Sequence, residues 1–235
     1  MAEKKSPPPL PFPCSLNRSR RRTLAIHIHP DATVEIRAPL KLSQTRIWAF
    51  VREKTPWILQ KRAEALARQD LRKRSVLSPG DSVSLLGRTY PLETAAPGIS
   101  PGLADGRILL PEGASREETA AVLAQVCRRL AKEYLPARAA ELAQRWGFSF
   151  QGVSITGART RWGSCSGKNH LNFSLRLAWA SLQAVDYVIL HELAHTWEHN
   201  HSPRFWAIVA ERMPGYRQQE AELKALQRQL SLFDL

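Results

Sequence analysis

The chain has 235 residues, of which 43% are hydrophobic and 23% charged, and its seven tryptophans suffice for a real core. Three cysteines without a C-x-x-C pair argue against a disulfide framework and for a reducing compartment. The first residues lack the apolar segment of a secretory signal, and no apolar run approaches the roughly 18 residues of a membrane span. We therefore expect a cytoplasmic protein.

The net charge of +13 is concentrated in the N-terminal third of the chain. Residues 1–80 carry a net charge of +11, and the other 155 residues carry only +2. A basic region of this kind can hold nucleic acid or another polyanion through phosphate contacts. The alternative is that these cations only keep a helix and a tail in solution, and no recognisable nucleic-acid motif accompanies them.

The N-terminal part begins with the proline-rich residues 1–17, which predict a disordered or extended lead-in. Residues 24–28 and 34–38 alternate between apolar and polar side chains around a Pro-Asp turn, which predicts a β-hairpin. His27 and His29 share one face of the first strand, and we interpret them as exposed residues and not as metal ligands.

Helices and a second group of strands follow. Ser43 can cap one helix, and Thr55-Pro56 predicts the start of another that runs towards Arg74. Short apolar runs with turn residues between positions 77 and 111 predict a small β-rich subdomain. Ser115 and Glu118 form a capping box, which predicts a long helix. That helix is expected to end at Trp146 before Gly147, with Pro136 bending or breaking it.

The last part returns to strands and then helices. Residues 153–156, 159–166 and 170–174 predict three strands. Helix signals return at Ser181, and this helix is expected to run to about Glu198. Two further helices are predicted, one from Pro203 to about Arg212 and a polar one that follows the Met213-Pro-Gly break and runs to the C-terminus.

The most informative stretch is His191-Glu-Leu-Ala-His195, followed by His201. Four of the seven histidines lie within eleven residues, on and after a mostly apolar helix whose buried polar groups need partners. Positions i and i+4 share one helix face, so both imidazoles can reach one Zn²⁺. Glu192 is rotated by roughly 100° from His191, which suits contact with a metal-bound water better than coordination.

A third ligand must come from a segment that leaves the helix and turns back. His201, in Asn200-His-Ser-Pro, sits at such a break. His199, Glu211 and Glu220 are the competing candidates for this position. Arg161, His170 and His199 are further candidates for oxyanion stabilisation or substrate contact, and the sequence does not rank them. We interpret Trp162 and Cys165 as structural residues of a turn.

Three segments together resemble the YgjP-like metallopeptidase family, relatives of the SprT-like zinc proteases. They are Arg161-Trp-Gly-Ser-Cys-Ser166, Asp186-Tyr-Val-Ile-Leu-His-Glu-Leu-Ala-His195 and Asn200-His-Ser-Pro-Arg-Phe-Trp206. The N-terminal hairpin and Lys54-Thr-Pro-Trp-Ile58 also look like that family, so the resemblance covers roughly residues 18–215.

This resemblance implies an α+β fold with a zincin-like core, in which a small antiparallel sheet packs on the active-site helix. It implies His191, His195 and His201 as zinc ligands and Glu192 as the catalytic carboxylate, in a metallopeptidase that acts on a peptide or protein. We accordingly divide the chain into residues 1–17 as a lead-in, 18–112 as an N-terminal β-rich and helical subdomain, and 113–235 as the metallohydrolase domain.

Two other functions stay open at this point. A metal-activated water attacks phosphorus as well as carbonyl carbon, so a phosphohydrolase acting on nucleotides is one alternative. The other is a nucleic-acid-binding module, or a protease associated with DNA, that uses the basic N-terminal third.

Overall fold

The computed structural model describes residues 10–233 and divides the chain after Ser75 into two compact units. The sequence-based division fell after residue 112 instead. Most of the predicted lead-in, residues 1–9, lies outside the described part of the chain. Among residues 10–233 every helix is too short or too polar to cross a membrane.

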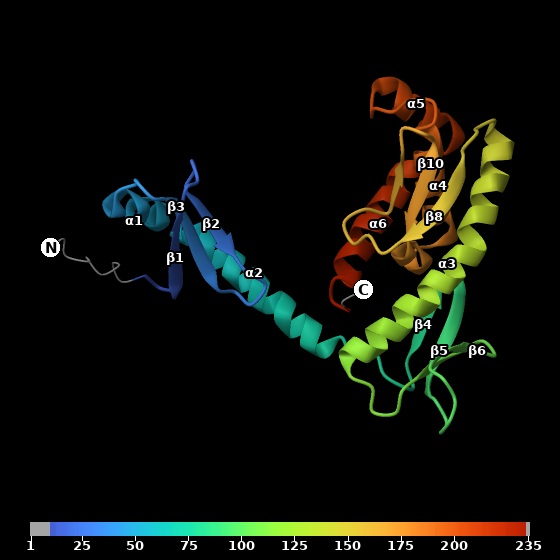
Figure 1. Cartoon of the computed structure of the whole chain (residues 1–235), viewed down its shortest axis with the longest axis horizontal. Helices are drawn as coiled ribbons and strands as arrows, with labels where there is room; N and C mark the ends of the chain where they lie inside the picture. The colour runs from blue at the N-terminus through green and yellow to red at the C-terminus, as the bar shows by residue number, and fades with distance from the viewer. Residues whose placement is uncertain (1–9, 234–235) are drawn as a thin grey trace. The chain divides into compact units, whose positions relative to one another are not determined.

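The first unit is a three-stranded sheet with two helices (Figure 1). Its elements are β1 (Cys14–Ser19), β2 (Ala25–Ile28), β3 (Val34–Pro39), α1 (Gln44–Glu53) and α2 (Thr55–Arg74). The predicted hairpin is confirmed, because β2 pairs with β3 in antiparallel fashion. Alternate residues of β3 join Ile47, Val51 and Ile58 of the helices in one apolar core.

Residues 14–17, expected to belong to a disordered or extended lead-in, are part of a paired strand. These residues belong to β1, which pairs with β3 in parallel, so that β3 is the central strand. The pairing brings Leu16 beside Ile36. The prediction rested on the proline-rich composition. In Cys14–Ser19, however, half-buried and exposed residues alternate, which allows a strand to form beside the edge of β3.

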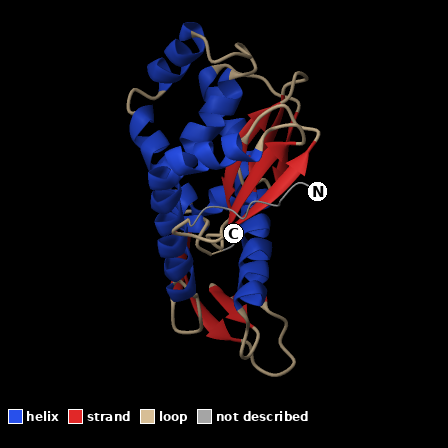
Figure 2. Ribbon diagram, turned by 90° about the vertical axis from the view of Figure 1, so that its left-hand side faces the viewer, coloured by secondary structure: helices blue, strands red, loops and turns tan. Residues whose placement is uncertain are grey.

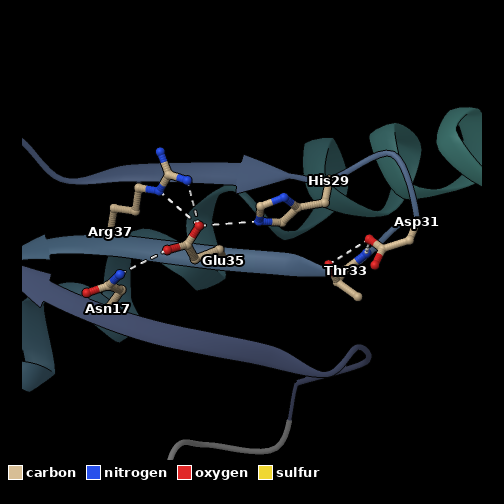
Figure 3. Close-up of polar contacts among 6 residues, drawn as sticks. All are labelled: Asn17, His29, Asp31, Thr33, Glu35 and Arg37. Atoms are coloured by element: carbon tan, nitrogen blue, oxygen red, sulfur yellow. Dashed lines mark hydrogen bonds and ion pairs between the residues drawn. The ribbon is translucent and has the colours of Figure 1, made fainter.

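A polar cluster on the same sheet surrounds Glu35 of β3 (Figure 3). Its carboxylate accepts hydrogen bonds from Arg37 at 2.7 and 2.9 Å and from Asn17 at 3.2 Å, and His29 lies 3.3 Å away. These contacts, chiefly the one from Arg37, lower the pKa of Glu35 to about 2. The prediction that both histidines are exposed strand residues is confirmed for His27 of β2, whereas His29 follows the strand and is half-buried against this carboxylate.

The second unit contains two sheets that contact one long helix, α3 (Arg116–Trp146) (Figure 1). Figure 2 distinguishes the helices and strands of the described residues by colour. The first sheet has the order β4-β5-β7-β6. Its strands are β4 (Ser82–Leu85), β5 (Arg88–Thr94), β6 (Gly102–Ala104) and β7 (Arg107–Leu110). Leu85, Leu92 and Ile108 from this sheet pack with Leu123 and Val126 of α3 in one core. This shared core explains why the β-rich segment belongs to the same unit as α3.

Helix α3 begins and ends where the sequence predicts. Ser115 and Glu118 form the capping box, and Gly147 adopts the left-handed conformation (φ 75°) after Trp146. A bend or a break was expected at Pro136; the helix continues through it, so the break does not occur. Ala131, Leu135 and Ala139 are fully buried on both sides of the proline, and this packing offsets the roughly 3 kcal/mol that an interior proline costs.

The second sheet consists of β8 (Gly152–Thr156), β9 (Gly163–Cys165) and β10 (His170–Ser174), in the order β8-β10-β9. The expected sheet was antiparallel, but the observed sheet is mixed, because β10 runs parallel to β8 and antiparallel to β9. The connection from β8 to β9 crosses to the far side of β10 and does not form a hairpin. Strand β9 is therefore an edge strand.

Helix α4 (Leu182–Ala194) contacts α3, β9 and the two last helices, α5 (Pro203–Arg212) and α6 (Tyr216–Leu230). Its N-cap, Ser181, is held by Glu222 of α6 through hydrogen bonds of 3.0 and 2.9 Å. Arg138 of α3 binds Asp186 of α4 in a bidentate pair at 2.7 and 2.5 Å. The predicted α+β class and the packing of a small sheet against this helix are thus confirmed.

Candidate metal centre

The centre is built on α4, which is anchored in the core. Val188, Ile189, Leu190 and Leu193 are all buried. His191 and His195, one turn apart, project from the same face, and their ring centroids lie 5.0 Å apart. The helix ends at Ala194, four residues earlier than expected, with His195 as its C-cap. This early end lets the chain turn back at once towards His191.

His201 completes a group of three histidines. Its Nε2 lies 3.0 Å from Nε2 of His191, and one nitrogen of each of the three imidazoles lies within 4.8 Å of the others. The competing third ligands are not part of this group: His199 is exposed, and Glu211 pairs with Arg212 at 2.8 Å. Glu220 lines the neighbouring cleft.

The three imidazoles suit a metal ion. Two ligands of a tetrahedral Zn²⁺, each about 2.0–2.1 Å from the ion, lie about 3.3 Å apart, which is close to the observed separation of the two Nε2 atoms. Nδ1 of His195 lies 3.1 Å from the backbone oxygen of Glu198, which orients the ring and leaves Nε2 for coordination. Burial and the neighbouring histidines lower the pKa of His191 to about 3, so its imidazole is neutral, as a metal ligand must be.

Phe205 of α5 supports all three rings. It is fully buried, and its ring centroid lies 4.9 Å from that of His191, 4.5 Å from that of His195 and 4.8 Å from that of His201. Ser202 caps α5 by accepting a hydrogen bond from the Phe205 backbone, which fixes this helix directly after His201. Sequence reasoning assigned no role to Phe205, because a phenylalanine at a helix start is an ordinary core residue.

Glu192 lies beside the histidines but faces the sheet. It is only 5% exposed, and burial raises the pKa of its carboxyl to about 8, while Arg161 and the backbone of Cys165 oppose this shift. The carboxyl therefore lies between the histidine-bearing face of α4 and the edge strand β9. The role of Glu192 beside a metal-bound water stays a prediction.

Gly163 of β9 makes the close approach of Glu192 possible. A Cβ atom at this position would lie 2.6 Å from Oε1 of Glu192, 2.7 Å from its Cγ and 2.9 Å from its Cδ. No side chain fits there without displacing the carboxylate. Sequence reasoning missed this role, although a glycine inside a strand is a general signal for close approach of another group.

The centre opens into a cleft of about 520 Å³ between the β9 segment and α6. Of the three residues proposed for substrate contact, Arg161 lines this cleft together with His191 and Glu192. His170 lies elsewhere, 2.8 Å from the hydroxyl of Ser154. Trp162 also lines the cleft, and its ring packs against Arg176 at 5.7 Å. Burial raises the pKa of Cys165 to about 11, which disfavours the nucleophilic thiolate.

Comparison with known proteins identifies a family. The sequence model of the YgjP-like metallopeptidase domain matches residues 22–226. No curated protein sequence matches the chain. Among solved structures, one similar chain is the metallopeptidase zymogen of Methanocaldococcus jannaschii, jannalysin. It is 21% identical and has a TM-score of 0.33, and the match covers 39% of this chain and 93% of that one. A similarity of this size carries no argument about the present protein.

Proposed function

Because the chain belongs to the YgjP-like metallopeptidase family, we propose that it hydrolyses peptide bonds with a zinc ion held by His191, His195 and His201. The observation that carries the proposal is the convergence of three imidazoles around one point, beside the buried carboxyl of Glu192. Three neutral protein ligands are typical of catalytic zinc sites, which keep a position open, whereas structural sites use four.

When bound, zinc supplies Lewis acidity and lowers the pKa of a coordinated water to about 7. The protein supplies the remaining chemistry. A cation held by the histidines would favour the ionised form of Glu192, whose pKa burial otherwise raises to about 8. In that form, Glu192 would take a proton from the attacking water and pass it to the leaving amine, as a general base and then a general acid. Gly163 and the backbone of Cys165 fix the position of this carboxylate.

The edge strand β9 suits an extended peptide. Among residues 10–233, only one of its two edges is paired, with β10, and the strand lies beside Glu192. A peptide that pairs with the free edge gains backbone hydrogen bonds that do not depend on its sequence. We infer that the substrate adds a strand along β9 and thereby places one of its peptide bonds at the histidines.

The second candidate is a phosphohydrolase that acts on nucleotides. The observation in its favour is the presence of Arg161, Lys224 and Arg228 in the cleft. A nucleic acid partner receives no support from the family match. A reducing, cytoplasmic location stays part of the proposal and is consistent with free thiols at Cys14, Cys127 and Cys165.

The test compares the wild type with Glu192→Gln and with Glu211→Gln as a control for the loss of one glutamate. Glu211 is exposed and lies outside the histidine group. Each protein, loaded with zinc, is assayed in parallel on a peptide mixture and on nucleoside triphosphates. We expect peptide cleavage that falls by about 10²–10⁴-fold only in Glu192→Gln, with zinc retained. Phosphate release without peptide cleavage would refute the proposal in favour of the second candidate.

A further inference from the structure

The cleft beside the histidines has a second wall, and that wall is helix α6. Glu220, Lys224, Gln227 and Arg228 line the cleft that also contains His191 and Glu192. These four positions have the i, i+4, i+7 and i+8 spacing of a single helix face. At about 520 Å³, the cleft is large enough for several side chains of a peptide. Helix α6 is therefore placed to contact a substrate on the side of the cleft away from β9.

Two of the four α6 side chains on this wall are cationic, and the acidic Glu220 lies nearer the histidines, within electrostatic range of Tyr187, whose ring centroid is 6.0 Å from that of His191. Lys224 and Arg228 belong to α6, and Arg161 lies on the opposite side, within electrostatic range of Glu192. Glu220 is the only acidic side chain of α6 that lines the cleft. The cleft is therefore lined by three cationic side chains and by the carboxyl groups of Glu192 and Glu220.

Within the described part of the chain, these three cations have no carboxylate bound to them. No ion pair or hydrogen bond of the Arg161, Lys224 or Arg228 side chain is present among residues 10–233, and all three are exposed. Arg138, by contrast, is held by both Asp186 and Glu141. Long cationic side chains that line a cleft and are not bound within the fold can pair with an anionic ligand.

We propose that these three cations, Arg161, Lys224 and Arg228, make the enzyme select peptides with an acidic side chain close to the scissile bond. We call them the cationic wall. The inference rests on the proposed peptidase function and adds its substrate class. A glutamate or aspartate of the substrate is attracted by Arg161, Lys224 and Arg228, whereas a lysine or arginine at the same place is repelled. Because the three cations are exposed, the preference weakens as salt concentration rises.

The test uses two fluorogenic peptide pools of equal length, one built from alanine and glutamate and the other from alanine and lysine. The wild type should show a kcat/KM about tenfold or more higher for the glutamate pool at low salt. In Lys224→Glu/Arg228→Glu, this ratio should fall to about one or reverse. Lys132→Glu/Arg145→Glu is the matched control, because both residues are exposed on α3 and line no part of the cleft. This control should keep the wild-type ratio.

The outcomes separate the two proposals. Equal cleavage of both pools by the wild type, or the same loss of preference in the control, overturns the cationic-wall inference and leaves the peptidase function intact. Cleavage of neither pool by zinc-loaded wild type contradicts the proposed function itself. Release of phosphate from nucleoside triphosphates, abolished by Lys224→Glu/Arg228→Glu, would assign the wall to a phosphate substrate and overturn the inference as well. Circular dichroism and zinc content verify that the double variants are folded.

Discussion

Replacement of Gly163 by alanine tests how closely catalysis depends on the contact between β9 and α4. The added Cβ atom would lie 2.6 Å from Oε1 of Glu192, whereas ordinary contacts begin at 3.4 Å. The carboxylate or the strand must therefore move by about 0.8 Å, the difference between these two distances. A displacement of about 1 Å in a catalytic group can cost about a hundredfold in rate.

We therefore expect kcat/KM for a peptide to fall by between about tenfold and a hundredfold in Gly163→Ala. Zinc content should be unchanged, since the atoms close to the added Cβ belong to Glu192 and not to a histidine. Gly167→Ala is the control, because its Cβ would meet no atom within 4 Å. A Gly163→Ala protein with kcat/KM within about twofold of wild type would refute the assigned position of Glu192.

Three further predictions concern stability and the support of the site. Phe205→Ala removes the ring beneath the three histidines, and unfolding in urea should show a loss of about 3–5 kcal/mol together with weaker zinc binding; unchanged zinc affinity would contradict the supporting role. Asp186→Ala leaves Arg138 without its bidentate partner and should lower the free energy of unfolding in urea by about 1–3 kcal/mol. An unchanged free energy of unfolding would contradict a stabilising role for this pair. The folded-state pKa of Glu35 is depressed to about 2 from an ordinary 4.5, so its contribution is present above pH 4.5 and is lost as the pH falls towards 2. The urea midpoints of wild type and Glu35→Gln should therefore converge over that range, and a constant difference would exclude this linkage.

Local sequence signals predicted the helices of the site well. Ser115 with Glu118 caps α3 and Ser181 caps α4 through their own side chains, and Gly147 ends α3 in the left-handed conformation. Such caps depend on residues within one turn of the helix end, so they can be read without knowledge of the fold. The i, i+4 spacing that joins His191 and His195 is local in the same sense.

Contacts between distant segments could not be predicted in this way. The parallel pairing of β8 with β10 and of β1 with β3 depends on the order of strands in space, which local alternation of side chains does not specify. The close approach of Gly163 to Glu192 and the position of α6 along the cleft have the same origin. Pro136 shows the converse case, because burial of its neighbours outweighs its local tendency to end a helix.

The most direct test of the three-histidine centre is the zinc content of wild type, His201→Ala and His199→Ala after dialysis. His199 is the matched control, because it lies two residues from His201 but is exposed and outside the group. We expect one zinc per chain in wild type and His199→Ala, and its loss or marked weakening in His201→Ala. Full zinc content in His201→Ala, or loss of zinc in His199→Ala, would contradict the assigned ligand set.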